Sequence, residues 1–140
     1  MVERLGSGLA HAGMLVFGVP LAFFVLPTPL AFTLGPAVSY FISRRFRRRQ
    51  RPWGAFQTLQ AAVLQLVILA LIVLAVAANL PPRLELTFGT AAFLLLLYSL
   101  WGAVDALMGY DFRYILIGNL VEKVSRANLG RINRGNSNRP

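Results

Sequence analysis

The chain has 140 residues, of which 56% are hydrophobic and only 14% are charged, and its mean hydropathy is +0.61. About a quarter of the residues of a soluble globular domain are charged, so this composition excludes that class and indicates a membrane protein. The net charge of +9 points to topology first, because basic residues of membrane proteins gather on one side. Cysteine is absent, which excludes disulfides and thiolate metal sites.

The length leaves room for about four membrane helices of about 20 residues. The first apolar segment, Leu9 to Leu26, is long enough to cross despite Pro20, and its weakly basic lead predicts a retained helix rather than a cleaved signal peptide. Pro27 to Pro29 predicts a turn. The next segment, Leu30 to Ile42, is short for a bilayer, so we expect a second helix that is extended to Pro29 to Arg44 or is bent and shielded by its neighbours.

Two longer apolar segments follow an arginine-rich stretch. The third predicted helix is Phe56 to Leu80, and the fourth runs from Leu84 or Leu86 to Met108, where Gly109 closes it. Because only a short connection separates them, these two helices should be antiparallel neighbours. The predicted fold class is therefore an all-α membrane protein with four transmembrane helices, the second one short.

Beyond the fourth helix, apolar residues recur at helical spacing with polar residues between them. Ile117, Leu120, Val121 and Val124 form this stripe, which predicts an amphipathic helix on the cytoplasmic surface of the membrane. Gly130 ends it. We predict a single four-helix transmembrane domain with this helix at its C-terminal end over residues 1–129, and a basic polar tail over residues 130–140.

The distribution of basic residues predicts the orientation. With four crossings, every Lys and Arg except Arg83 lies on the same side as both termini. The positive-inside rule places that side, with the arginine-rich loop, in the cytoplasm, and we assign the chain to the cell inner membrane. Tyr40, Phe41, Trp53 and Tyr110 fall at the same boundary, where amphipathic rings prefer to lie.

His11 is the only histidine and lies inside the first apolar segment, with Gly8 and Gly18 on the same helical face. One hypothesis is an axial ligand for haem or (bacterio)chlorophyll, since glycines would let a flat macrocycle approach. The other is a hydrogen-bonding histidine at a close helix–helix contact, which small residues at this spacing also favour. The second interpretation needs no cofactor.

Three glutamines, Gln57, Gln60 and Gln65, fall on one side of the third predicted helix, which should face protein. They indicate hydrogen bonds between helices or, alternatively, the lining of a polar pathway. Asp105 is the only acid within a predicted crossing. We expect it to pair with Arg113 or with an arginine of the loop, since a proton relay would need a second buried acid or histidine nearby.

The arginine-rich loop is the densest charge in the chain. Between two membrane helices it favours contact with anionic lipid headgroups, including a bound phospholipid, or docking on an acidic face of a partner protein. Nucleic acid would also suit guanidinium groups, but this position does not favour it. The candidate docking residues are Arg44, Arg45, Arg47, Arg48, Arg49 and Arg51.

Motifs of enzymes are missing from the sequence. It has no Gly-rich phosphate loop, no paired carboxylates, no zinc-type cluster and no nucleophile with a histidine placed to activate it. We therefore expect no enzymatic activity.

Two stretches resemble known membrane families. Residues 55–64, AFQTLQAAVL, resemble the Phe-x-x-x-Gln-Ala helix opening of the Tic-type import family of the chloroplast inner envelope and its bacterial relatives. Residues 109–115, GYDFRYI, resemble the Gly-x-x-Tyr-Arg-Tyr-Pro ending of a related bacterial family of unknown function, whose first helix often carries the Leu-Ala-His found at residues 9–11.

The resemblance covers about residues 3–123 and implies a four-helix membrane protein and, for the plastid branch, a role in protein import. It departs from the family pattern at Trp53 and Gly54, which replace a polar residue, at Ile115, which replaces proline, and in the richness of the arginine loop. Import would be carried to this chain by analogy of fold alone.

The favoured function is a non-catalytic accessory or assembly subunit of a larger integral membrane complex, respiratory or photosynthetic. Its partners would be other integral membrane proteins and anionic lipids, with the glycine-rich first helix as a contact face. The alternatives are a transport or protein-translocation component like the Tic-type family, which needs a polar pathway, and a haem- or chlorophyll-binding subunit that uses His11.

Overall fold

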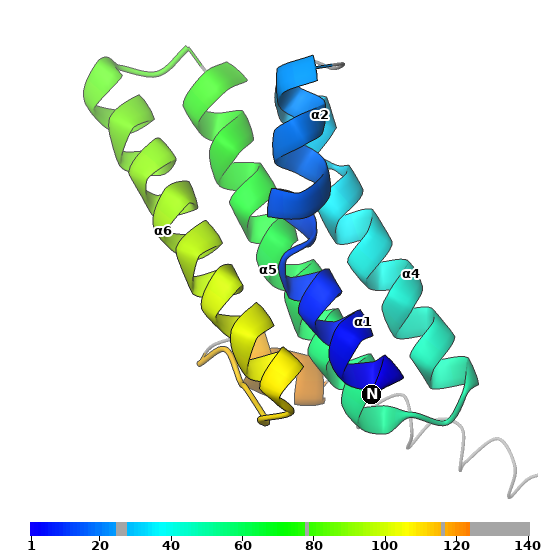
Figure 1. Cartoon of the computed structure of the whole chain (residues 1–140). Coiled ribbons are helices and arrows are strands. Elements are labelled where there is room, and N and C mark those ends of the chain that lie inside the picture. The colour runs from blue at the N-terminus through cyan, green and yellow to red at the C-terminus, as the bar shows by residue number, and fades with distance from the viewer. Residues whose placement is uncertain (25–27, 78, 116, 124–140) are drawn as a thin grey trace, which may run out of the picture.

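The computed structural model describes residues 1–24, 28–77, 79–115 and 117–123. Helices and their connections make up this part of the chain, and it contains no strand. Figure 1 shows the helices side by side in one bundle, in which α5 contacts α1, α4 and α6. The predicted all-α class is thus confirmed for the described residues.

The first helical segment is broken rather than continuous. It consists of α1 (Val2–His11), a π-helical turn η1 (Met14–Gly18) and α2 (Val19–Phe24), with a bend of 61° between the parts before and after the break. Pro20 has no N–H for the carbonyl four residues before it, which lies within the π-helical turn. The predicted crossing from Leu9 to Leu26 is thus a bent segment, and it begins seven residues earlier, at Val2.

The second segment is interrupted at Thr33 and is longer than the predicted Leu30 to Ile42, since it begins at Thr28 and ends at Arg48. It comprises α3 (Thr28–Phe32) and α4 (Leu34–Arg48). The break follows from Pro36, whose ring clashes with the carbonyl of Phe32 and cannot donate a hydrogen bond to it. Because α4 continues to Arg48, most of the arginines predicted in a loop are helical, and the connection to the next helix is short.

The long helices α5 (Pro52–Ala77) and α6 (Pro82–Met108) agree closely with the third and fourth predicted crossings. Both are long and apolar enough to cross a membrane, and the bent segment of α1 to α2 would make a third span if it is counted as one. They pack against each other, as their short connection predicts. Gly109 ends α6 with φ of +88°, a left-handed conformation that glycine adopts without strain.

One end of the bundle collects the chain's polar extensions. The N-terminus, the end of α4, the start of α5 and the end of α6 lie together at the lower end of Figure 1, with residues 117–123 beside them. Residues 117–123 are helical, and Val121 is buried whereas Leu120 is exposed, so only part of the predicted apolar stripe faces the bundle. Val124 and the predicted tail at 130–140 lie outside the described residues.

Candidate functional site

The break in the first helix is surrounded by polar side chains from three other helices. The carbonyl of Ala10 accepts hydrogen bonds from Gln65 Nε2 at 2.6 Å and from Ser39 Oγ at 2.9 Å. The carbonyl of His11 accepts one from Ser99 Oγ at 2.6 Å. Because lipid offers no hydrogen bonds, carbonyls at a break must be satisfied by protein. A backbone N–H at the end of α1 bonds to the Ala10 carbonyl, and α4, α5 and α6 each add a side-chain donor. Gln65 is therefore bonded to backbone rather than lining an open path.

The His11 ring extends this cluster to the segment that follows α6. Its Nδ1 lies 2.7 Å from the Tyr114 hydroxyl, and both side chains are buried. Burial raises the pKa of the Tyr114 phenol well above its usual range, so the hydroxyl keeps its proton and can donate it to Nδ1. Tyr98, Phe112 and His11 surround the Tyr114 ring edge-on. We call His11, Tyr114, Ser99, Gln65 and Ser39 the buried polar cluster.

The second ring nitrogen of His11 faces a complementary group. An imidazole that accepts at Nδ1 carries its proton on Nε2. Gln57 interacts with the His11 side chain. The Oε1 atom of Gln57 is a buried acceptor without a hydrogen-bond partner, and Nε2 of His11 is a buried donor without one. The two atoms match chemically, although their geometry falls short of a hydrogen bond. This arrangement favours the interpretation of His11 as a hydrogen-bonding residue at a close helix contact.

The surroundings of the first-helix glycines do not fit a macrocycle. A Cβ at Gly8 would lie 2.5 Å from Leu107, and a Cβ at Gly18 would lie 2.7 Å from Phe32, so helices of this chain fill the space that a haem or chlorophyll would need. The glycines of this segment thus pack inward, whereas Val2, Leu5, Leu9 and Val16 form its exposed apolar side. Among the described residues, no group of His, Asp and Glu is placed to hold a metal ion.

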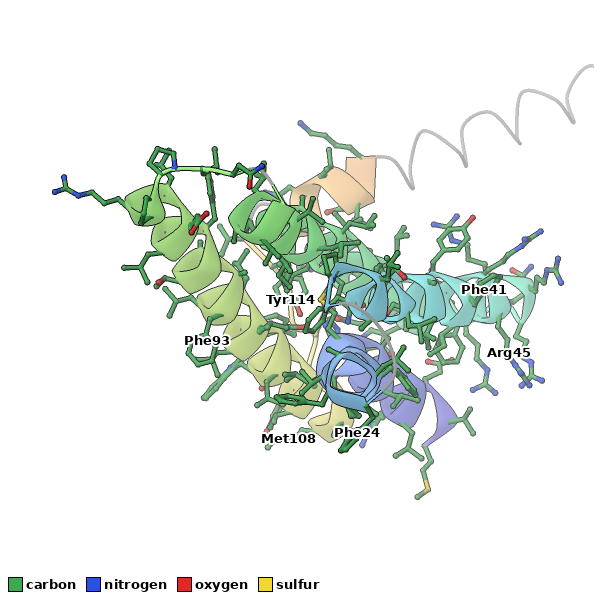
Figure 2. The ribbon with its side chains drawn as sticks, turned by 90° about the horizontal axis from the view of Figure 1, so that it is seen from above. Phe24, Phe41, Arg45, Phe93, Met108 and Tyr114 are labelled. Carbon is green, nitrogen blue, oxygen red and sulfur yellow. The ribbon has the colours of Figure 1, made fainter. Side chains whose placement is uncertain are left out.

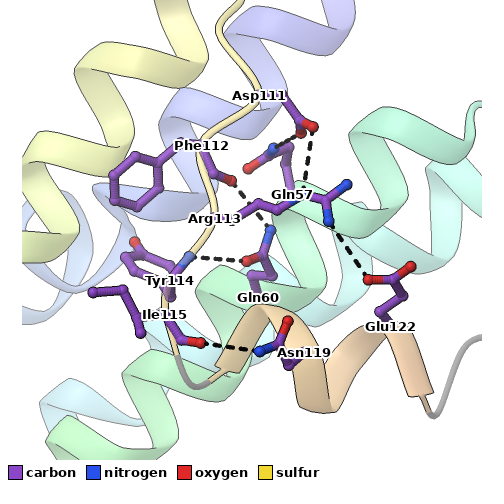
Figure 3. Close-up of polar contacts among 9 residues, drawn as sticks. All are labelled: Gln57, Gln60, Asp111, Phe112, Arg113, Tyr114, Ile115, Asn119 and Glu122. Atoms are coloured by element: carbon purple, nitrogen blue, oxygen red, sulfur yellow. Dashed lines mark hydrogen bonds and ion pairs between the residues drawn. The ribbon is translucent and has the colours of Figure 1, made fainter.

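Gln57 and Gln60 hold the segment after α6 against α5 (Figure 3). Gln60 Oε1 accepts from the Tyr114 amide at 3.2 Å, and Gln60 Nε2 donates to the Phe112 carbonyl at 3.4 Å. Gln57 Nε2 donates to Asp111 Oδ1 at 3.0 Å. All three glutamines are fully buried, so the predicted side of this helix does face protein. Through these bonds, the glutamines hold two irregular stretches of backbone: the first-helix break and residues 111–114.

Asp105 does not make the predicted ion pair with Arg113. The partners of Arg113 are Asp111, at 3.5 Å, and Glu122, also at 3.5 Å (Figure 3). The left-handed Gly109 turns the chain sharply after α6, which brings Arg113 over α5, where its guanidinium lies 5.5 Å from the Phe56 ring centre. Neither Arg113 nor an arginine of the 44–51 segment pairs with Asp105, and no ion pair of the described residues includes it.

The arginines form a separate feature at the end of α4. A groove of about 470 Å³ is lined by one aromatic and four basic side chains: Phe41, Arg44, Arg45, Arg48 and Arg49. We call it the arginine groove. In Figure 2, Phe41 and Arg45 lie at the end of α4, far from Tyr114 at the bundle centre. Arg47 is exposed but does not line the groove, and Arg51 pairs with Glu3 at 3.4 Å.

Sequence reasoning missed most of the partners in the buried polar cluster. Tyr114 entered only through the motif at residues 109–115, and Ser39 and Ser99 were not singled out. Serine inside a membrane helix is common and carries no signal of its own, because its usual partner is the carbonyl four residues earlier. A signal existed for Tyr114, since it is a tyrosine beside an arginine directly after the last crossing.

Comparisons of the chain with protein-family models, with curated proteins and with solved structures find no match. The resemblance to the Tic-type family therefore rests on the short sequence motifs alone.

Proposed function

We propose that the chain is a non-catalytic accessory or assembly subunit of a larger integral membrane complex. In this proposal it crosses the inner membrane four times, through α1 to α2 as one bent span, α3 to α4 as a second, and α5 and α6. Both termini and the arginines lie in the cytoplasm, following the positive-inside rule. The shared end of the bundle that carries the N-terminus, the arginines and residues 117–123 supports this arrangement (Figure 1).

The observation that carries the proposal is an open glycine on the outer half of α6. No atom lies within 4 Å of a Cβ built at Gly89, and the glycine is exposed. Leu86 and Phe93, one turn before and one turn after it, are 73% and 59% exposed. Glycine inside a helix costs about 1 kcal/mol relative to alanine, and nothing in the described part of this chain uses the space it leaves. Membrane helices use such gaps to bring a second helix close.

The position of Gly89 supports a partner from another protein. The main neighbours of α6 are α1 and α5, and α1 lies at the cytoplasmic end of the bundle in our orientation, so among the described residues the outer half of α6 is flanked mainly by α5 (Figure 1). Phe93 lies on the side of α6 turned away from the bundle centre (Figure 2). We infer that an apolar helix of a partner protein packs across Gly89, between Leu86 and Phe93.

The transport alternative has less support from the geometry. A transport pathway would need polar side chains with free hydrogen-bonding groups facing a common channel. Gln60 and Gln65 instead bond to backbone of this chain, and Gln57 bonds to Asp111. Replacing all three by leucine should disturb folding because it removes these bonds, and a variant that stays folded but loses transport would favour the alternative.

The experiment compares two substitutions that add volume to exposed positions of α6. Native membranes solubilised in mild detergent are resolved on a native gel, and the chain is located by an affinity tag. We expect the wild type and the control Val104→Leu to migrate with a large complex, and Gly89→Leu to migrate free because the added side chain fills the gap. A wild type that migrates alone, or a Gly89→Leu variant that stays in the complex, would show the proposal to be wrong.

A further inference from the structure

The arginine groove concentrates positive charge that the rest of the chain leaves unneutralised. All five acids of the sequence belong to the described residues, and none lies on α4. Glu3 pairs with Arg51, and Asp111 and Glu122 pair with Arg113. No ion pair of the described residues includes any of the four groove arginines.

This arrangement is unfavourable unless an anion joins it. Arg44 and Arg48 are four residues apart on α4, as are Arg45 and Arg49 at its end, and like charges at that spacing destabilise a helix. The negative end of the helix dipole offsets part of this repulsion. The four side chains nevertheless converge on one groove instead of spreading around the helix.

The wall of the groove places it at a membrane interface. Phe41 lies one turn before Arg45 and is 65% exposed, and Tyr40 beside it is exposed as well. Exposed aromatic rings are typical of the boundary between hydrocarbon and headgroups. An anion in the groove would therefore have headgroup depth, with an apolar ring at the side where acyl chains begin.

The spacing of the arginines sets the number of phosphates. They fall into two levels, Arg44 with Arg45 and Arg48 with Arg49, separated by about 6 Å along the helix axis because each residue rises about 1.5 Å. A guanidinium group binds a phosphate through two parallel hydrogen bonds, and two guanidinium groups at one level can share one phosphate. The two pairs of arginines can therefore bind two phosphates of one ligand, one phosphate at each level.

We propose that the arginine groove binds one anionic lipid whose headgroup carries two phosphates, such as a diphosphatidyl lipid, with one phosphate at each arginine level. The site depends on membrane insertion but not on the partner complex, so it is independent of the accessory function proposed above. It differs from a general attraction to anionic membranes in that it assigns unequal roles to neighbouring arginines.

The test uses the purified full-length chain in detergent and native mass spectrometry with added cardiolipin. Arg48→Gln and Arg47→Gln remove the same charge from adjacent exposed positions, but only Arg48 lines the groove. We expect Arg48→Gln to weaken cardiolipin binding about tenfold, the loss typical of one charge-assisted phosphate contact. Arg47→Gln should weaken it less than about twofold, which is the screened long-range part.

Three results would overturn the inference. Equal losses in the two variants would show a diffuse field without a site. Phosphatidylglycerol at twice the molar concentration binding as tightly as cardiolipin would remove the requirement for two linked phosphates. Displacement of cardiolipin by micromolar inorganic pyrophosphate or by an RNA oligonucleotide would show that the groove does not select a lipid. Gly89→Leu should bind cardiolipin like the wild type, which separates this test from that of the complex.

Discussion

Replacing Tyr114 by phenylalanine removes one hydroxyl group from the centre of the buried polar cluster and leaves the ring in place. The hydroxyl lies 2.7 Å from His11 Nδ1, and Tyr114 is only 2% exposed. Its ring contacts with Tyr98 and Phe112 do not involve the oxygen, so the substitution creates little cavity. The change therefore removes the hydrogen bond to the break in the first helix, together with the hydroxyl's interaction with Ser99.

The expected loss follows from what is left behind. Without the hydroxyl, His11 Nδ1 becomes a second buried ring nitrogen without a partner, because Nε2 already has none. Burying one unsatisfied group costs about 1–3 kcal/mol, whereas hydrogen bonds between membrane helices average about 0.6 kcal/mol and reach about 1.7. We expect Tyr114→Phe to lower the free energy of unfolding by about 1–2 kcal/mol, toward the upper part of the membrane range.

The assay is reversible unfolding in mixed micelles of mild detergent and dodecyl sulfate, followed by circular dichroism. Tyr110→Phe is the matched control, because Tyr110 is 63% exposed and should unfold like the wild type. The double variant Tyr114→Phe with His11→Leu should be at least as stable as the less stable of the two single variants, because each single substitution already removes the bond between His11 and Tyr114. Equal stability of Tyr114→Phe and Tyr110→Phe would refute the assignment of His11 and Tyr114 as a structural pair.

Other predictions use the same unfolding assay. Gln65→Leu should lower the free energy of unfolding by about 1–2 kcal/mol by removing its bonds at the first-helix break, whereas a channel-lining glutamine would leave it unchanged. Gly35→Ala should destabilise by about 1–3 kcal/mol, because its Cβ would lie 3.0 Å from the Met14 amide nitrogen, whereas Gly89→Ala, which meets no atom within 4 Å, should not. Burial raises the pKa of Tyr114, so the folded state holds this proton more tightly than the unfolded state. The free energy of unfolding should therefore be constant below about pH 10 and fall above it, and it should fall less in Tyr114→Phe. A difference between wild type and Tyr114→Phe that does not change with pH would contradict this.

The long helices could be predicted because their signal is local. An uninterrupted apolar run fixes α5 and α6, and proline at the start and Gly109 at the end fix their limits to within a few residues. The breaks in the first two helical segments depend on more than local sequence. Pro36 marks the break in the second segment, but the 61° bend of the first lies between His11 and Met14, away from Pro20, where distant side chains bond to the carbonyls of Ala10 and His11.

The burial of the site's glutamines could be predicted from local sequence, but their hydrogen-bond partners could not. Periodicity placed Gln57, Gln60 and Gln65 on one protected side of a helix, which the structure confirms. It could not name their partners, because these are backbone groups of the first-helix break and of residues 111–114, exposed by irregular geometry. The ion pair predicted for Asp105 failed for a related reason, since the reversal at Gly109 redirects Arg113 toward Asp111.

The interior and the surface of this bundle consequently serve different purposes. The interior glutamines and serines hold the chain's own irregular backbone, and the first-helix glycines admit its own helices. Two described features lack any such internal use: the gap at Gly89 and the arginine groove. They lie at opposite ends of the bundle, since α6 begins at the end away from the arginines (Figure 1). A partner helix at one end and a lipid headgroup at the other can therefore bind at the same time, and the two proposed interactions can be lost independently.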